Sequence, residues 1–425
     1  MSDSPTDPLL ALRRDLHRHP EPAWCEFYTT ARIVEELDRI GVDDRYLGAD
    51  ALSVDDRMAV PDDATLDEWF QRALDAGADE DVLEHFEGGT TGAVAVLERG
   101  AGPTVGLRVD IDALPIEEAD SDHDPAERGF RSENEGYMHA CGHDAHATIG
   151  VGVLEAVKES DFSGTFKVFF QPAEERVGGG KAVAKGGHLD DVDYLFAVHV
   201  GLDHPTGEVV AGMGGFLAVS HLLAEFEGAP SHAGAEPNAG RNAVQAVGTA
   251  IQNLYAIPRH KDGATRVNAG RIGGGTTSNI VPAEAFVEGE VRGETTRLRD
   301  YMGEKAERVF HNAAEMHECE VELSTEGEAP SAESDQQLVD VVEDVAKHQP
   351  DVDHVLEHAA LGGSEDATYL MQHVQKQGGL ATYVGVGTDH PGGHHTATFD
   401  VDETSLDIGI DVLTDAVVET VERIP

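Results

Sequence analysis

The sequence predicts an α/β protein of two domains: a mostly parallel sheet covered by helices on both faces, and a smaller inserted α+β sandwich. Two observations predict this fold. Strand-like runs alternate with helical patterns before about residue 212 and after about residue 327, which is typical of a parallel sheet. Between these regions the elements follow the order β-α-β-β-α-β, which is typical of a small open-faced sandwich.

The first region supplies most of the expected sheet. Residues 7–41 predict two helices, because Ile33, Leu37 and Ile40 recur at helical spacing and Gly41 suits a C-terminal cap. An acidic, polar stretch follows at 52–90, with a helical pattern near 66–83. We then expect strands at 93–98, 104–109, 165–170 and 194–200, and a helix at 144–158.

The middle section predicts the sandwich, and in the last section strands and helices alternate again, as in the first region. We expect strands at 216–228, 265–272, 284–293 and 319–324, with helices at 243–255 and 297–317. After these come helices at 335–347 and 364–374, a strand at 380–387 and a helix at 403–423. The predicted domains are therefore 1–212 with 327–425, and an insertion at 213–326.

Charge excludes several classes of partner. The 425 residues include 30 Lys and Arg against 81 Asp and Glu, a formal charge of −51. Nucleic acids and anionic membranes are polyanions, so we expect neither as a partner. The acid is spread along the whole chain, and its self-repulsion is largely screened only at molar salt. We therefore expect a protein of a high-salt cytoplasm.

The cysteines and the termini fit that location. Three cysteines, Cys25, Cys141 and Cys319, are too few and too scattered for a disulfide framework. The first residues lack a basic start followed by an apolar run, so we expect no signal peptide. The sequence contains no stretch of 18 apolar residues, so we expect no membrane span.

The densest cluster of reactive side chains is His-Ala-Cys-Gly-His-Asp-Ala-His at 139–146, just before a predicted helix. Cys141 and His143 are separated by one glycine, a spacing that lets a thiolate and an imidazole turn towards one metal ion. The ordinary alternative is that Cys141 is a small buried apolar residue and that a chain with 22 histidines forms such pairs by chance.

Other candidates follow predicted strands. Glu174 and Glu175 come after 165–170, where one carboxylate could bind metal and the other move protons; the alternative is a solvated helix start. His199 ends 194–200, although a lone histidine there is more often a satisfied core residue. The remaining candidates are Asp110 and Asp112 after 104–109, alternatively turn caps, and His394 and His395 after 380–387.

These groups share one position in the predicted fold. Each follows a strand of the same sheet, and ligands of open α/β sheets bind at the strand ends. Cysteine, histidine and glutamate with open coordination positions suit a hydrolytic metal centre, with one metal or with two about 3.5–4 Å apart.

The motifs together resemble a known family. The segments RRDLHRHPEP (13–22), LRVDIDALP (107–115), HACGHDAH (139–146), FQPAEE (170–175), VHV (198–200), SHAGAEPNAGRNAV (231–244), SNIVP (278–282) and GHH (393–395) resemble the aminoacylase/amidohydrolase branch of metallopeptidase family 20. The insertion spanning 57–89 and GSEDATYLM (363–371) resemble the A subunit of the p-aminobenzoyl-glutamate hydrolase subgroup.

The resemblance implies a binuclear centre. Cys141 would bridge two metal ions, and their ligand shells would be completed by His143, Glu175, His199 and His395. His395 is preferred to His394 because its spacing to Phe399 fits the late motif of the family. Glu174 would be the general base and acid, and Asp112 would contact a metal ligand rather than the metal itself.

The resemblance also gives the insertion a function, as a lid and dimerisation domain. His232 would stabilise the oxyanion, while Asn279 and Arg292 would hold the carboxylate of the substrate. The ordinary alternatives are a turn residue, a cap and a surface strand charge.

The expected activity is metal-dependent cleavage of N-acyl or N-aroyl amino acids, such as p-aminobenzoyl-glutamate or hippurate. The subgroup favours Mn²⁺, and Zn²⁺ or Co²⁺ also suits these ligands. One alternative is a general aminoacylase or dipeptidase; another is a non-catalytic partner of a hydrolase complex. The free sheet edge expected in the insertion would permit a homodimer or a hetero-oligomer with a homologous subunit.

Overall fold

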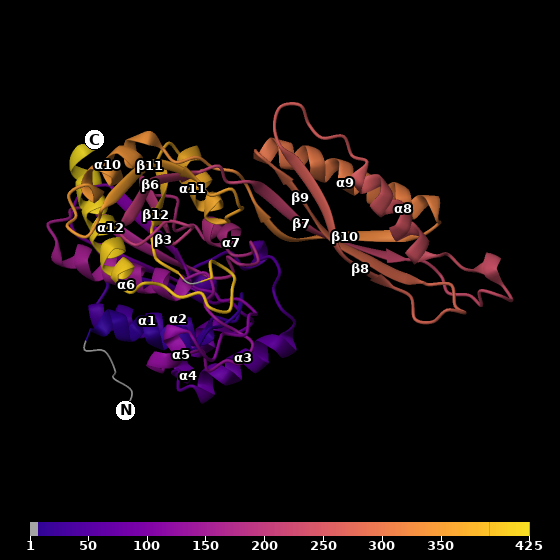
Figure 1. Cartoon of the computed structure of the whole chain (residues 1–425), viewed down its shortest axis with the longest axis horizontal. Helices are drawn as coiled ribbons and strands as arrows, with labels where there is room; N and C mark the ends of the chain where they lie inside the picture. Colours follow the sequence, from indigo (N-terminus) through magenta and orange to yellow (C-terminus); the bar gives the residue numbers. More distant parts are fainter. Residues whose placement is uncertain (1–6, 391, 425) are drawn as a thin grey trace. The chain divides into compact units, whose positions relative to one another are not determined.

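A computed structural model describes residues 7–390 and 392–424. The chain forms two compact units (Figure 1). Unit 1 comprises Met1–Gly215, Ala332–Leu361 and Asp366–Pro425, and unit 2 comprises Phe216–Ser331 and Gly362–Glu365. Unit 2 therefore includes a short second segment beyond the inserted stretch.

Unit 1 is built on a sheet of eight strands, counted over the described residues, in the order β1-β2-β4-β3-β5-β12-β6-β11. The pairs β3·β4, β3·β5, β5·β12 and β6·β11 are parallel, and the pairs that involve β1, β2 or the β6·β12 contact are antiparallel. The strands are β1 (Asp44–Leu47), β2 (Ala93–Glu98), β3 (Thr104–Asp110), β4 (Thr165–Gln171), β5 (Tyr194–Val200), β6 (Glu208–Gly214), β11 (His354–Ala360) and β12 (Leu380–Val386).

Helices pack around this sheet. In one layer α6 contacts α1 and α12, and α12 contacts α10; α7 and α11 pack together separately. The helices of unit 1 are α1 (Pro8–Arg18), α2 (Phe27–Ile40), α3 (Asp63–Asp75), α4 (Glu80–Leu83), α5 (Asp124–Arg128), α6 (His143–Glu159), α7 (Gly180–Lys185), α10 (Gln336–Ala346), α11 (Ala367–Lys376) and α12 (Thr404–Arg423). Short 3-10 helices lie at Gly48–Asp50, Val54–Asp56 and Glu84–Phe86.

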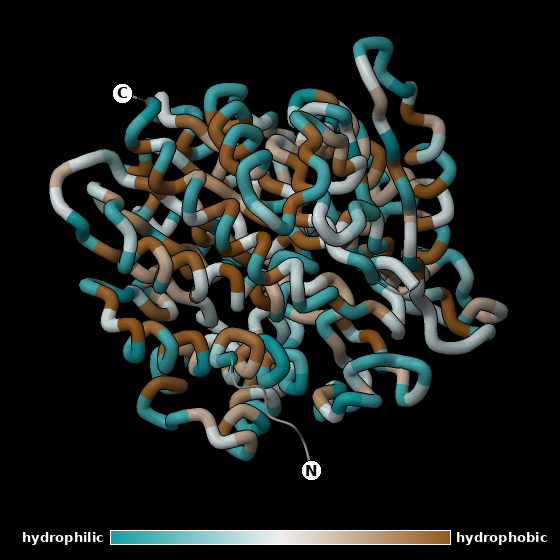
Figure 2. The backbone as a smooth tube through the Cα atoms, turned by 60° about the vertical axis from the view of Figure 1, so that its left-hand side comes forward, coloured by the Kyte–Doolittle hydropathy of each residue, from teal (hydrophilic) through white to brown (hydrophobic). Residues whose placement is uncertain are grey.

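The central strands are apolar because both of their faces are covered. All seven residues of β5 are buried, and Phe196, Val198 and Val200 join the main core with residues of α6 and α12. In Figure 2 the brown, apolar segments concentrate inside this unit. The predicted α/β class with a mostly parallel sheet is confirmed.

Unit 2 is an open-faced sandwich. Its antiparallel sheet has the order β10-β7-β9-β8, from β7 (Ala218–Glu227), β8 (Thr265–Gly274), β9 (Glu284–Gly293) and β10 (Glu320–Ala329). The helices α8 (Ala243–Tyr255) and α9 (Thr296–Met316) cover one face, around a core that includes Phe226 and Phe310; a short 3-10 helix lies at Pro237–Ala239. Sheet and helices thus follow the predicted order.

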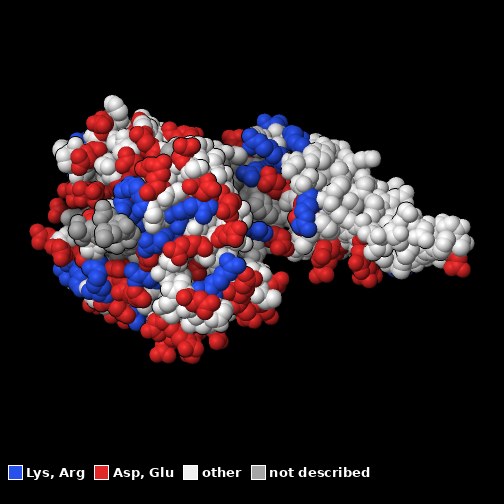
Figure 3. Space-filling view, turned by 60° about the horizontal axis from the view of Figure 1, so that its bottom comes forward, with Lys and Arg blue, Asp and Glu red and all other residues white. Residues whose placement is uncertain are grey.

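The surface of unit 1 carries the acid expected from the composition. On the face in Figure 3, Asp and Glu side chains are scattered over this unit and are interrupted by smaller basic patches. None of the helices in the described part of the chain combines the length and the apolar character that a bilayer crossing requires.

Candidate metal centre

The candidate ligands of unit 1 come from the ends of neighbouring strands. Glu175 follows β4, His199 lies near the end of β5, and His395 lies in the loop after β12. Cys141 and His143 flank the start of α6, where Gly142 has a φ of 84° and would place a Cβ against Val200. Because β4, β3, β5 and β12 run parallel, these segments meet at one edge of the sheet.

The first ligand group is Cys141, His143 and His199. Their ligand atoms all lie within 4.8 Å of one another, and all three residues are buried. The Sγ of Cys141 lies 3.5 Å from Nε2 of His199. The Nδ1 of His199 donates a hydrogen bond to the carbonyl of Val200 at 2.7 Å, which leaves a lone pair on Nε2. This tautomer is the one that binds a metal through Nε2.

Asp112 orients His143 in the same way. The Nδ1 of His143 lies 3.2 Å from Oδ1 of Asp112, and the other oxygen of Asp112 accepts the backbone N–H of Glu175 at 3.0 Å. Within the described residues, Nε2 of His143 is buried and has no hydrogen-bond partner. A histidine that bonds a carboxylate through one ring nitrogen, while the other nitrogen has no partner, is typical of a metal ligand.

The second ligand group shares a member with the first. Cys141, Glu175 and His395 also place their ligand atoms within 4.8 Å of one another, so Cys141 belongs to both groups. Nε2 of His395 lies 3.6 Å from Oε2 of Glu175, while Oε1 of Glu175 is buried without a hydrogen-bond partner in the part of the chain that the structure describes. A donor set of sulfur, nitrogen and oxygen fits two divalent ions that share one sulfur.

His394 is close to the same sulfur but is turned differently. Its Nδ1 lies 3.4 Å from Sγ of Cys141, and its Nε2 accepts the N–H of Leu202 at 2.8 Å. A neutral imidazole that accepts at Nε2 carries its proton on Nδ1, so His394 faces Cys141 as a donor. The geometry therefore favours His395 as the ligand.

The electrostatics of the cluster favour a cation. Burial lowers the pKa of His143, but the carboxylates of Asp110, Asp112 and Glu175 outweigh it and raise this pKa to about 10. Burial and the carboxylate of Asp112 raise the pKa of Glu175 above its usual range. The carboxylates around the buried His143 concentrate negative charge there, and a divalent ion would neutralise it.

Glu174 lies beside these ligands on a strained turn. It is 9% exposed, and its Oε2 lies 4.0 Å from Nε2 of His143. Ala173 and Val177 adopt φ values of 58° and 52°, a region that non-glycine residues rarely occupy. The buried carboxylate of Glu26 accepts the N–H of Ala173 at 2.8 Å and holds this turn in place. Such strain is concentrated at functional sites.

Asp110, a candidate from the sequence, pairs with His146, for which the sequence predicted no role. Nδ1 of His146 bonds the carboxylate of Asp110, and its Nε2 accepts the N–H of Val200, next to His199, at 2.8 Å. The spacing of three residues between His143 and His146 on α6 places both on one helix face, which was the available sequence signal.

The candidates in unit 2 are more exposed. His232 is exposed, and its Nδ1 accepts the N–H groups of Gly234 and Ala235 at 3.1 and 3.0 Å. Its proton therefore lies on Nε2, which is available as a donor. The backbone carbonyl of Asn279 accepts the N–H of Ala233 at 3.0 Å, so Asn279 and His232 lie together.

Arg292 lies far from that pair within one copy of unit 2. It is eight residues beyond Glu284, the start of β9, which corresponds to about 27 Å at about 3.4 Å per residue, and Asn279 lies before that start. The guanidinium of Arg292 bonds both oxygens of Glu290 at 2.8 and 2.9 Å. One carboxylate thus cannot contact Asn279 and Arg292 of a single chain, and each role remains a separate prediction.

Comparisons with known proteins show the family of the chain. Residues 106–419 match Peptidase family M20/M25/M40. The chain is 43% identical over 406 residues to the indole-3-acetyl-aspartic acid hydrolase of Enterobacter agglomerans, covering 94% of this chain and 93% of that protein. It is 41% identical to the A subunit of the p-aminobenzoyl-glutamate hydrolase of Escherichia coli, with the same coverage.

A solved structure is similar over the whole length. The aminobenzoyl-glutamate utilization protein of Klebsiella pneumoniae has a TM-score of 0.85 and 35% sequence identity, over 98% of this chain and 96% of that one. The family match covers well over half of the chain, and these relatives are named for hydrolysis or use of amides of amino acids. The chain belongs to Peptidase family M20/M25/M40 and is a metallo-amidohydrolase.

Proposed function

We propose that this enzyme hydrolyses the amide bond between an acyl or aroyl group and an acidic amino acid, as in p-aminobenzoyl-glutamate. The observation that carries the proposal is the pair of ligand groups that share Cys141, next to the carboxylate of Glu174. The names of two relatives support the substrate class, since p-aminobenzoyl-glutamate and indole-3-acetyl-aspartic acid both release an acidic amino acid. Hippurate-like substrates, which release glycine, are the neighbouring class.

The proposed cofactor is a pair of divalent ions, with Mn²⁺ favoured and Zn²⁺ or Co²⁺ as alternatives. Cys141, His143 and His199 would hold one ion, and Cys141, Glu175 and His395 would hold the other. When bound, such ions polarise an amide carbonyl and lower the pKa of water towards about 7. Asp112 keeps His143 in the tautomer that this requires.

Glu174 is the proposed proton carrier. Its carboxylate takes a proton from the attacking water and gives it to the leaving nitrogen. The turn around Ala173, held by Glu26, fixes the backbone of Glu174, so the carboxylate is placed before the substrate arrives.

Residues of unit 2 are proposed to bind the substrate. Nε2 of His232 donates a hydrogen bond to the oxyanion, a contribution typically worth about 10²–10³-fold in turnover. Arg292 holds a carboxylate with two parallel hydrogen bonds, for which it must leave Glu290. Asn279 supports the group near His232.

Assembly with a second copy, or with a homologous subunit, would let both ends of β9 serve one substrate. We propose such a homodimer or hetero-oligomer; the name of the Escherichia coli relative, one lettered subunit of a hydrolase, supports the second form. The charge of −51 supports a working environment of high salt, in the cytoplasm.

The test is hydrolysis of p-aminobenzoyl-glutamate, p-aminobenzoyl-alanine and hippurate at high salt, with Mn²⁺, Zn²⁺ or a chelator. We expect the first substrate to be cleaved fastest, and chelation to abolish cleavage. Cleavage of dipeptides with a free amine alone would identify a general dipeptidase instead. Failure to cleave any substrate until a homologous subunit is added would identify a non-catalytic partner.

A further inference from the structure

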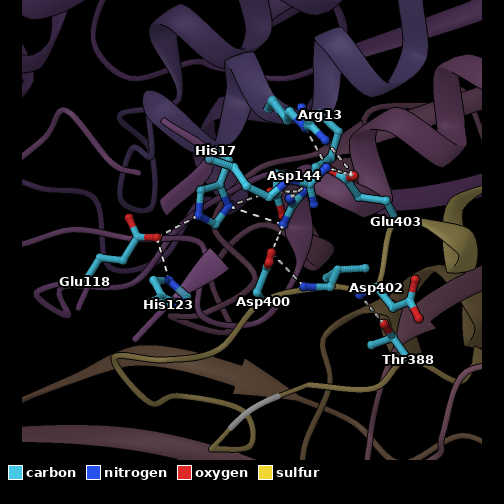
Figure 4. A network of polar contacts seen from close by, with 12 residues as sticks. Arg13, His17, Glu118, His123, Asp144, Thr388, Asp400, Asp402 and Glu403 are labelled. Atoms are coloured by element: carbon cyan, nitrogen blue, oxygen red, sulfur yellow. Dashed lines mark hydrogen bonds and ion pairs between the residues drawn. The ribbon is translucent and has the colours of Figure 1, made fainter. Parts of the chain in front are cut away.

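A buried ionic network lies behind the metal-ligand segments of unit 1 (Figure 4). At its centre is Arg13 of α1, whose side chain is 1% exposed. Its Nε forms an ion pair with Oδ2 of Asp144 at 3.0 Å, and its Nη2 donates to Oδ1 of Asp400. Glu403 lies 3.8 Å from Nη1. One guanidinium therefore contacts carboxylates from two separate parts of the chain.

These two parts of the chain also carry the proposed metal ligands His143 and His395. Asp144 directly follows His143 at the start of α6, and Asp400 lies five residues after His395. The loop that carries His395 is also tied to the segment before α6 by its backbone, since the N–H of His395 donates to the carbonyl of Ala140 at 2.8 Å. Arg13 adds a second tie between these segments.

The network is anchored so that Asp144 cannot move freely. His17, also on α1, bonds Oδ2 of Asp144 through Nδ1 at 2.8 Å and Oε1 of Glu118 through Nε2 at 2.9 Å. Glu118 in turn bonds His123 at 2.8 Å and accepts the N–H of Ser132 at 2.6 Å. The start of α6 is thus held from α1 and from the segment around Glu118.

The loop that carries His395 and Asp400 is held by polar contacts of its own. The N–H of Val401 donates to Oδ1 of Asp400 at 2.8 Å, and the N–H of Asp402 donates to the hydroxyl of Thr388 at 2.8 Å. Since each segment is internally fixed, the contact through Arg13, together with the hydrogen bond between His395 and Ala140, determines how far apart they lie. An arginine suits this position because its planar, always charged fork can contact two carboxylates at once, whereas lysine offers a single point charge.

We propose that Arg13 is a positioning residue that sets the distance between the two metal-ligand segments, and so allows two ions to share Cys141. The inference rests on the proposed metal centre. Arg13 itself contacts neither ions nor substrate in this role. Its removal would release the loop of His395, so the ion held by Cys141, Glu175 and His395 would be affected more than the ion held by Cys141, His143 and His199.

The test uses Mn²⁺ alone, added to the metal-free full-length protein at high salt. Binding is measured by calorimetry, and the electron paramagnetic resonance spectrum reports whether two Mn²⁺ ions are magnetically coupled. In the wild type we expect two ions per chain and a coupled spectrum. In Arg13→Gln we expect the affinity of the second site to fall at least ten-fold, and the six-line spectrum of isolated Mn²⁺ to replace the coupled one.

Arg14→Gln is the matched control. Arg14 is the next residue of α1, packs over the same Phe130 ring at 5.0 Å, against 5.2 Å for Arg13, and bonds Glu403 through two nitrogens at 2.7 Å each. Among the described residues it forms no ion pair with Asp144 or Asp400. We expect this variant to retain two coupled ions.

Arg13→Gln leaves buried carboxylates without their partner, and this cost can prevent folding. A second variant decides the question in that case. Asp400→Asn keeps the ion pair between Arg13 and Asp144 and weakens only the contact between Arg13 and the loop of His395. We expect the same selective loss of the second ion. A folded Arg13→Gln or Asp400→Asn protein with wild-type affinity and an unchanged coupled spectrum would overturn the inference. Absence of Mn²⁺ binding by the wild type would instead count against the proposed function.

Discussion

The candidate residues of unit 1 and those of unit 2 are held in opposite ways. In unit 1, His143 and His199 are buried, and each has one ring nitrogen fixed by a carboxylate or a carbonyl; His395 is the exception, with a side chain that is 54% exposed. In unit 2, His232 is exposed and is oriented only by two backbone N–H groups of its own turn. Arg292 is partly buried and is engaged with Glu290.

The difference separates two kinds of functional residue. A metal ligand must be placed before the ion binds, so burial and supporting hydrogen bonds are part of its function. A residue that contacts substrate must first admit it and can then be brought to it by closure. Changes in unit 1 should therefore alter metal binding and folding, whereas changes in unit 2 should alter catalysis while stability stays the same.

The largest effect on activity is expected from Glu174→Gln, a change in unit 1 that should leave metal binding intact. We expect turnover to fall by about 100-fold or more, as for a lost acid–base group, with two ions still bound. Steady-state kinetics and metal analysis of the same preparation check this. Full activity in the variant would remove Glu174 from the mechanism.

His232→Ala should lower turnover by about 100-fold, the lower end of the range for a lost oxyanion donor, without a change in the midpoint of thermal unfolding. The reason is that the exposed ring supports no core packing, whereas a lost oxyanion donor slows the chemical step. Kinetics and thermal unfolding in parallel measure both quantities. A variant that loses metal, or that unfolds several degrees earlier, would contradict the contrast.

Arg292→Lys should mainly raise KM for p-aminobenzoyl-glutamate, by about ten-fold, because lysine cannot form two parallel hydrogen bonds with one carboxylate. Turnover at saturation should change less. As a control, an amide substrate without a carboxylate should show similar kinetics with both proteins; equal KM changes for both substrates would exclude carboxylate recognition by Arg292.

The smallest expected effect is a pH dependence of stability that comes from His17. Burial and Arg13 lower its pKa, but Asp144 and Glu118 outweigh them and raise it to about 9 from an ordinary value of 6.5. Because the folded-state pKa is raised, this stabilisation is fully present below pH 6.5 and is lost as the pH rises through about 9. The loss amounts to up to about 3 kcal/mol of unfolding free energy.

Denaturant unfolding of the metal-free protein at about pH 6.5 and about pH 9.5, beside His17→Gln, measures this contribution. The variant should be less stable at the lower pH and should lose less stability on going to the higher one. Parallel pH profiles for the two proteins would show that His17 does not couple to folding.

Sequence pattern was sufficient for most of the buried elements, although it missed β6, whose five central residues are all buried. The predicted strands at 93–98, 194–200 and 284–293 coincide with β2, β5 and β9, because strands packed on both faces, or on one face in alternation, leave a clear apolar pattern. The predicted helix at 243–255 likewise coincides with α8. Nothing in the prediction covered β1 or β11, which are edge strands with mostly exposed side chains and thus lack that pattern.

The same limit applies to the site. Cys141, Glu175 and His199 could be singled out because each lies at a strand or helix end that the pattern locates. Of the residues that support them, Asp112 was also singled out, whereas Glu26 and Arg13 were not. The contacts of these two depend on partners far away in the sequence: Glu26 reaches Ala173, and Arg13 reaches Asp400 across 387 positions. The choice between His394 and His395 likewise depended on a tautomer, which only the contact with Leu202 reveals.

The contact between Arg13 and Asp400 has a consequence for biosynthesis. Asp400 is translated 387 residues after Arg13. Contacts of such long range close late, after local helices and hairpins have formed. The nascent polypeptide therefore cannot close this contact before the segment around Asp400 has been synthesised.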